Sequence, residues 1–240
     1  MLVVLFVFPV ACWTWIIVMA RDMYGSMSGA SRWMMTPSWD APHLFLLWAM
    51  WAVMMTGMML PSAAPAILIF GLAARRRHRR QAAGLIYALA AGYLTIWALF
   101  SVLATVAQRI LGERLLLSPM MEMTSAAAGA TMLILAGAYQ LTPLKDSCLR
   151  ACQSPLGFLM RRWGDGWRGA FRMGLEHGLY CLGCCWALML LLFVGGVMNL
   201  AVIGGLTAFV AVEKMRLLGR QGARISGIVL VVFGLWMFTR

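Results

Sequence analysis

The chain has 240 residues, of which 62% are hydrophobic and only 12% are charged. Soluble domains carry about 25% charged residues, so this composition excludes an ordinary soluble domain and favours an integral membrane protein. The net charge of +12 lies in loops between apolar segments, and no basic patch alternates with aromatic residues on a polar surface. We therefore expect the lipid bilayer as a partner and do not expect nucleic acid.

Long apolar runs predict an all-α fold, a polytopic membrane helical bundle of about seven transmembrane helices in a single domain over residues 1–240. The first run lacks the positive n-region of a signal peptide, so we expect it to be retained as a helix. A tight turn at Gly195-Gly196 leaves a re-entrant pair open as an alternative to two separate spans. The predicted helices cover residues 2–20, 44–70, 82–106, 120–141, 169–194, 197–212 and 225–238.

Most of the 20 basic residues fall in three loops that share one side of such a bundle. The positive-inside rule makes that side, and with it the N-terminus, cytoplasmic. The longest of these loops, residues 142–168, is amphipathic and is expected to lie at the membrane surface. The residues in the three loops are Arg75, Arg76, Arg77, Arg79 and Arg80; Lys145, Arg150, Arg161, Arg162, Arg168 and Arg172; and Lys214, Arg216, Arg220 and Arg224.

The fifth predicted helix carries a group of ionisable and sulfur side chains. A helix turns about 100° per residue, which places His177, Cys181, Cys184 and Cys185 on one face, with Glu176 beside them. Neutral imidazole and thiolate are ligands that suit Cu(I) and Zn(II). The alternative is that the cysteines are small buried apolar side chains. Because ionisable residues within a membrane are costly, we favour a metal or redox site.

A second pair of thiols, Cys148 and Cys152, follows the fourth predicted helix at i, i+4 spacing. If the fourth and fifth helices are neighbours, Cys148, Cys152, His177 and Cys181 form a four-ligand metal site. A reversible disulfide between Cys148 and Cys152, or a resting pair of reduced thiols, is the alternative.

The second predicted helix is rich in methionine. Met50, Met54 and Met58 share one face, and Met55 and Met59 form a neighbouring row. Thioethers are soft ligands that prefer Cu(I), so these rows could offer weak exchangeable sites, although Met also packs readily in any apolar core. Pro61 and Pro65 predict a kink beside a cavity, or a kink that serves packing alone.

These segments resemble a bacterial family catalogued as domain of unknown function 2182 and described as predicted metal-binding integral membrane proteins. The resemblance covers nearly the whole chain, and it implies a multi-pass protein of the bacterial inner (cytoplasmic) membrane. The matching segments are residues 50–55, 58–65, 139–145 with Cys148 and Cys152, 177–186, 196–200 and 213–214.

The prediction is a metal-binding integral membrane protein that binds or transports a soft transition metal. Copper is favoured, zinc stays open and haem is not expected. Binding is favoured over catalysis. The alternatives are a membrane thiol–disulfide or cofactor-dependent redox protein, and an accessory subunit of a larger membrane complex; a homo-oligomer also stays open.

Overall fold

The computed structural model describes residues 3–25, 39–77, 79–118, 121–215 and 219–239. Within these residues every named element is a helix, and the only β pairing is an isolated bridge between Leu117 and Met123. The predicted all-α class is therefore confirmed for the described part of the chain.

In the first half of the chain, the described residues form mainly long helices. Pro61 lacks a backbone N–H, so it ends α3, and a single 3₁₀ turn carries the chain into α4. The helix is thus interrupted at Pro61, where a kink was predicted. The elements are η1 (Val3–Val7), α1 (Phe8–Met23), α3 (Ala41–Met59), η2 (Pro61–Ala63), α4 (Ala64–Arg77) and α5 (Ala82–Glu113).

The second half contains shorter helices and more changes of direction. The chain bends by 64° between α6 and α7, where Thr142 caps the new helix by accepting a hydrogen bond from the Lys145 amide. The elements are α6 (Ala126–Gln140), α7 (Pro143–Gln153), α8 (Pro155–Arg162), α9 (Gly166–Leu190), α10 (Leu192–Gly195), α11 (Leu200–Lys214) and α12 (Gly219–Phe238).

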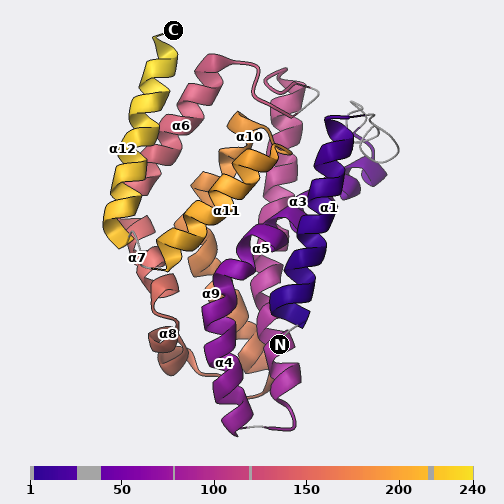
Figure 1. The fold of residues 1–240 in the computed structure, drawn as a ribbon, viewed down its shortest axis with the longest axis vertical. Helices are drawn as coiled ribbons and strands as arrows, with labels where there is room; N and C mark the ends of the chain where they lie inside the picture. Colours follow the sequence, from indigo (N-terminus) through magenta and orange to yellow (C-terminus); the bar gives the residue numbers. More distant parts are fainter. Residues whose placement is uncertain (1–2, 26–38, 78, 119–120, 216–218, 240) are drawn as a thin grey trace.

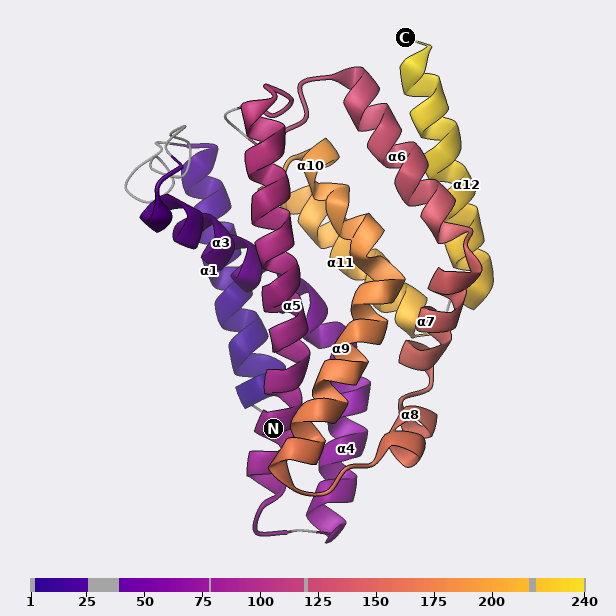
Figure 2. The same cartoon turned by 180° about the vertical axis from the view of Figure 1, so that it is seen from behind.

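Two close helix pairs organise the bundle, α5 with α9 and α6 with α12 (Figure 1, Figure 2). Small residues allow the close approach: a Cβ on Gly92 would lie 2.1 Å from the Phe171 carbonyl oxygen, and one on Gly174 would lie 2.0 Å from that of Leu89. Helix α11 contacts α3, α9 and α12, so it lies between the two pairs. This arrangement brings the middle of α9 against α5, α7 and α11.

Among the described residues, five segments are long and apolar enough to cross a membrane, and a sixth is added if the bent pair α6 and α7 counts as one span. The structure does not confirm seven spans. Helix α11 has only 15 residues, fewer than the about 20 that a span needs. The five segments are residues 3–23, 41–77, 82–113, 166–195 and 221–238.

Several predicted boundaries need correction. The third helix continues to Glu113, and the fourth begins at Ala126 after an irregular segment. The predicted amphipathic loop 142–168 contains two helices, α7 and α8. Lys145 and Lys214, which were predicted as loop charges, are buried side chains, because each has polar partners inside the bundle.

Candidate metal centre

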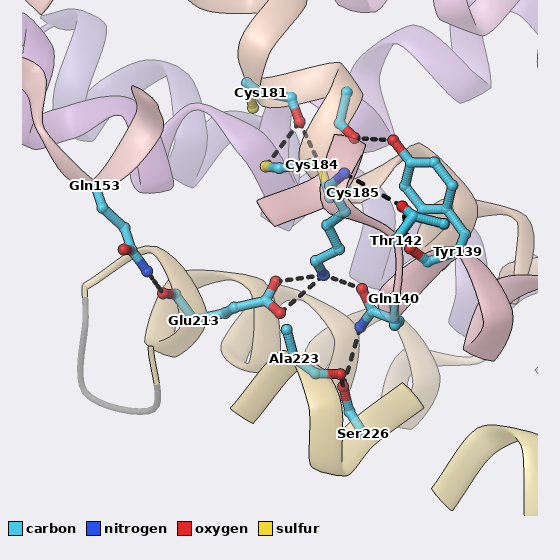
Figure 3. Close-up of polar contacts among 12 residues, drawn as sticks. Tyr139, Gln140, Thr142, Gln153, Cys181, Cys184, Cys185, Glu213, Ala223 and Ser226 are labelled. Carbon is cyan, nitrogen blue, oxygen red and sulfur yellow. Dashed lines mark hydrogen bonds and ion pairs between the residues drawn. The ribbon is translucent and has the colours of Figure 1, made fainter. Parts of the chain in front are cut away.

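Helix α9 places its sulfur side chains on one buried face, as the helical spacing predicted. Cys181, Cys184 and Cys185 are each 1% exposed, and His177 is 6% exposed. The Cys184 and Cys185 thiols point back at the Cys181 carbonyl oxygen, at 3.1 and 2.9 Å (Figure 3). The sulfur atoms of one helical turn therefore gather in a small volume.

Two further sulfur atoms join them from other helices. The Cys152 thiol on α7 lies close to the Cys184 thiol. The Cys185 Sγ lies 3.9 Å from the Met59 Sδ at the end of α3. We call Cys152, Cys181, Cys184 and Cys185 the thiol cluster; three helices contribute the sulfur atoms in and beside it.

The thiol cluster also contacts Tyr93 and Lys214, which the sequence prediction missed. The Tyr93 hydroxyl lies 3.0 Å from the Cys181 Sγ and donates to the Met59 carbonyl oxygen at 2.9 Å. The Lys214 Nζ lies 2.9 Å from the same Sγ and 2.9 Å from the Ser62 Oγ. A lysine at the end of an apolar run was a usable signal, because buried charges in apolar segments are functional by default.

His177 borders a cavity next to the thiol cluster. Its ring packs against Tyr93 and Phe158, with centroid distances of 5.7 and 5.5 Å. Its Nδ1 is buried and has no hydrogen-bond partner among the described residues. The cavity has a volume of about 280 Å³ and is lined by Ser62, Pro65, Ala66, Cys152, Gln153, Pro155, His177, Ala211, Lys214 and Met215. The proline-rich break after α3 therefore borders a cavity, as one of its two interpretations predicted.

The predicted four-ligand set of Cys148, Cys152, His177 and Cys181 is not assembled. Cys152 reaches Cys184, whereas Cys148 packs beside Gly183, where an added Cβ would lie 2.7 Å from its Sγ. Both thiols therefore face the same turn of α9, around Gly183 and Cys184, and not the turn of His177.

Glu176 also lies apart from the thiol cluster. Its carboxylate is 3.2 Å from the Arg172 Nε and 3.6 Å from the Arg162 Nε. The carboxylate of Glu176 thus takes part in ion pairs, one of them with an arginine one turn away on the same helix. The structure does not bring Glu176 to the sulfur atoms.

The methionines of α3 lie in the core. Met50, Met54, Met55, Met58 and Met59 are all buried, on a helix that contacts α1, α5 and α11. Met59 belongs to the neighbouring row, not to the face of Met50, Met54 and Met58, and it is Met59 that contacts a cluster thiol.

A second buried charge lies close by but has a different partner. The Lys145 Nζ is 2.8 and 2.9 Å from the two carboxylate oxygens of Glu213 and also donates to Gln140, whose amide donates to Ser226 at 3.1 Å (Figure 3). Lys145 and Glu213 neutralise each other, so they leave the Lys214 ammonium to the thiols.

The thiol cluster offers soft donors and a positive charge in an apolar core. Among the described residues, no three His, Cys, Asp or Glu side chains are already arranged around a metal position. The sulfur atoms instead contact one another and Lys214. The thiol cluster and Met59 therefore suit a soft monovalent ion bound by two or three sulfur atoms, because thiolate and thioether ligands select Cu(I).

The chain matches a known protein family. A family model described as PpoB2, copper chaperone, matches residues 48–237. This range includes the thiol cluster, Met59, Tyr93, His177 and Lys214. The match supports the prediction of a metal-related family. It does not show that this family is domain of unknown function 2182, which the motifs resemble. No curated protein and no solved structure matches the chain.

Proposed function

Because the chain belongs to the PpoB2 family of copper chaperones, we propose that it is a membrane copper chaperone that holds Cu(I) at the thiol cluster. The observation that carries this proposal is the contact between four thiols and the Met59 thioether inside an apolar core. Copper is the cargo here, and the sulfur atoms are its ligands.

Charge balance favours Cu(I) over Zn(II). Two thiolates and one Cu⁺ carry a net charge of −1, which the adjacent Lys214 ammonium would neutralise. Zn²⁺ takes four ligands, and with four thiolates it carries −2, of which Lys214 would cancel only half. An uncompensated charge in an apolar interior is costly, so the cluster with its single lysine is better matched to copper.

The neighbours of the cluster define a path for the ion. On one side the methionine rows of α3 end at Met59, next to Cys185. On the other side Cys152 and His177 border the cavity. Weak thioether sites thus lead to stronger thiolate sites and then to an opening. The positive-inside rule would place the arginine-rich end of α4 in the cytoplasm of a bacterial inner membrane, which makes this path inward.

The test is an anaerobic titration of the detergent-purified protein with Cu(I) in the presence of a chromophoric competitor. We expect the wild type to remove copper from the competitor and the double variant Cys181→Ser/Cys184→Ser to lose this ability. Cys12→Ser is the matched control, because Cys12 is a buried thiol on α1. Equal copper binding by the wild type and the double variant would contradict the proposal.

One observation favours a second candidate, thiol–disulfide exchange. Cys152 borders the cavity and contacts Cys184, so the Cys152 thiolate could attack an incoming disulfide, break its S–S bond and release one of its thiols. The Cys184 thiolate would then attack the resulting mixed disulfide, release the second thiol and leave a Cys152–Cys184 disulfide. Rapid formation of a Cys152–Cys184 disulfide with oxidised glutathione, in a protein that does not bind Cu(I), would favour this candidate.

A further inference from the structure

An arginine-lined pocket lies between α7, α8 and α9, apart from the cavity at His177. It has a volume of about 400 Å³. We call it the arginine pocket; it is lined by Arg150, Ala151, Ser154, Gly157, Phe158, Arg161, Arg162 and Tyr180. Three guanidinium groups and two hydroxyl groups therefore surround a space large enough for a small anionic group.

The arginines of this pocket outnumber the nearby carboxylates. The Arg150 Nη1 pairs with Asp146 at 2.8 Å. The Arg162 Nε is 3.6 Å from Glu176, which Arg172 already holds at 3.2 Å. Arg161 has no ion pair among the described residues. The pocket thus keeps an excess of positive charge, with Arg161 free to bind an external anion.

The opposite side of α8 is apolar and exposed. Leu156 is 58% exposed and Met160 is 77% exposed, and both line a second cavity of about 240 Å³ between α8 and α4. Arg77 at the end of α4 stacks over Trp163 at 4.5 Å at the edge of this cavity. A short helix with arginines on one side and Leu and Met on the other suits the boundary between headgroups and acyl chains.

The position of α8 agrees with such a boundary. It lies toward the end of the molecule at which α4 ends and α9 begins, away from the far end of α12 (Figure 1, Figure 2). The run Arg75, Arg76 and Arg77 closes α4 at that same end. Clusters of basic residues next to membrane spans attract anionic lipids.

We propose that the arginine pocket binds the phosphate headgroup of an anionic lipid, whose acyl chains lie along Leu156 and Met160. Guanidinium groups bind phosphate through paired N–H donors, and the Ser154 and Tyr180 hydroxyls can each donate one further hydrogen bond. The exposed apolar side of α8 selects a lipid over free phosphate, because free phosphate gains nothing from it.

The site shares one wall with the proposed copper site but does not depend on it. Phe158 lines the arginine pocket, and its ring packs against His177. The proposed lipid contacts are nevertheless made by the arginines and by the apolar side of α8. Lipid binding can therefore be measured on protein free of copper. A failure of this proposal would leave the copper proposal standing, and the reverse also holds.

The experiment is native mass spectrometry of the copper-free protein in detergent, with added phosphatidylglycerol, phosphatidylcholine or inorganic phosphate. We expect a bound phosphatidylglycerol that survives detergent removal in the gas phase and little bound phosphatidylcholine. Arg161→Gln should weaken phosphatidylglycerol binding about fivefold, since one arginine at the membrane surface contributes on the order of 1 kcal/mol.

Arg76→Gln is the matched control, because it removes the same charge at the same end of the molecule but lies outside the arginine pocket. It should weaken lipid binding clearly less than Arg161→Gln does. Equal losses of lipid binding in the two variants would show attraction to basic charge in general and overturn the proposal. No loss of lipid binding in either variant would overturn it as well. Displacement of the lipid by an equal concentration of inorganic phosphate would overturn the assignment to a lipid.

Discussion

The Lys214 ammonium contacts the Cys181 thiol and the Ser62 hydroxyl, and it has no carboxylate partner among the described residues. A lysine buried in this way is costly unless a negative charge compensates it. The thiol cluster can supply that charge as thiolate, and a Cu(I) ion held by two thiolates leaves one negative charge for Lys214. In the proposed function, Lys214 would therefore act as the counter-ion of the copper-loaded site.

Lys214→Met is expected to weaken Cu(I) binding by about tenfold or more, because the loaded cluster would carry an unpaired negative charge. Lys214→Arg keeps the charge and should retain most of the affinity. A competition titration with Cu(I) measures both. Affinity that is unchanged, or higher, in the methionine variant would contradict the counter-ion role.

Local periodicity was sufficient to predict the sulfur face of α9, because Cys181, Cys184 and Cys185 lie within about one turn of a single helix. It could not choose between Cys148 and Cys152, since that choice depends on where α7 crosses α9. Lys214 was predicted as a loop charge, because the apolar run that predicts the sixth helix ends at residue 212. Only the fold shows that α11 carries this lysine to Cys181.

At the scale of elements, the contact between α5 and α9 sets the position of Tyr93 against Cys181. Gly92 lies next to Tyr93, and an added Cβ there would lie 2.1 Å from a backbone oxygen of α9. Backbone cannot yield as a flexible side chain can, so the two helices would have to separate.

Gly92→Ala should therefore destabilise the protein by about 1–3 kcal/mol, measured as a lower thermal unfolding temperature in detergent. Gly84→Ala is the control on the same helix, because nothing lies within 4 Å of its added Cβ. The control should be neutral or slightly stabilising, since alanine is the better helix former. Equal effects at the two positions would mean that close packing of α5 on α9 is not what Gly92 provides.

The sequence predicted long helices better than short ones. Pro61 marked the break between α3 and α4 because it lacks an amide hydrogen. By contrast, α7 and α8 were predicted as an amphipathic surface loop, because their 11 and 8 residues are too few and too polar to form an apolar run of the length of a span. The count of spans was uncertain for the same reason: α11 is apolar, but its 15 residues fall short of a membrane crossing.

At the scale of the whole molecule, Lys145 and Glu213 join α7 to α11, and Gln140 extends the contact to Ser226 on α12. These helices enclose the thiol cluster on the side away from α5. Both charges are fully buried, so removing one leaves the other uncompensated in the core.

Lys145→Met and Glu213→Gln should each destabilise the protein by about 3–5 kcal/mol. The double variant should lose less stability than the sum of the two single losses, because neither charge is then left without its partner. Unfolding in detergent at increasing temperature compares the four proteins. Additive losses would show that the two side chains stabilise the bundle independently.

The proposed function depends on copper bound by sulfur inside the bundle. X-ray absorption spectroscopy at the copper edge, on protein loaded anaerobically with Cu(I), tests it most directly. We expect two or three sulfur neighbours around a monovalent ion in the wild type, and loss of this signal in Cys181→Ser/Cys184→Ser. Copper surrounded by nitrogen or oxygen alone, or a sulfur signal unchanged in that double variant, would contradict the thiol cluster as the copper site.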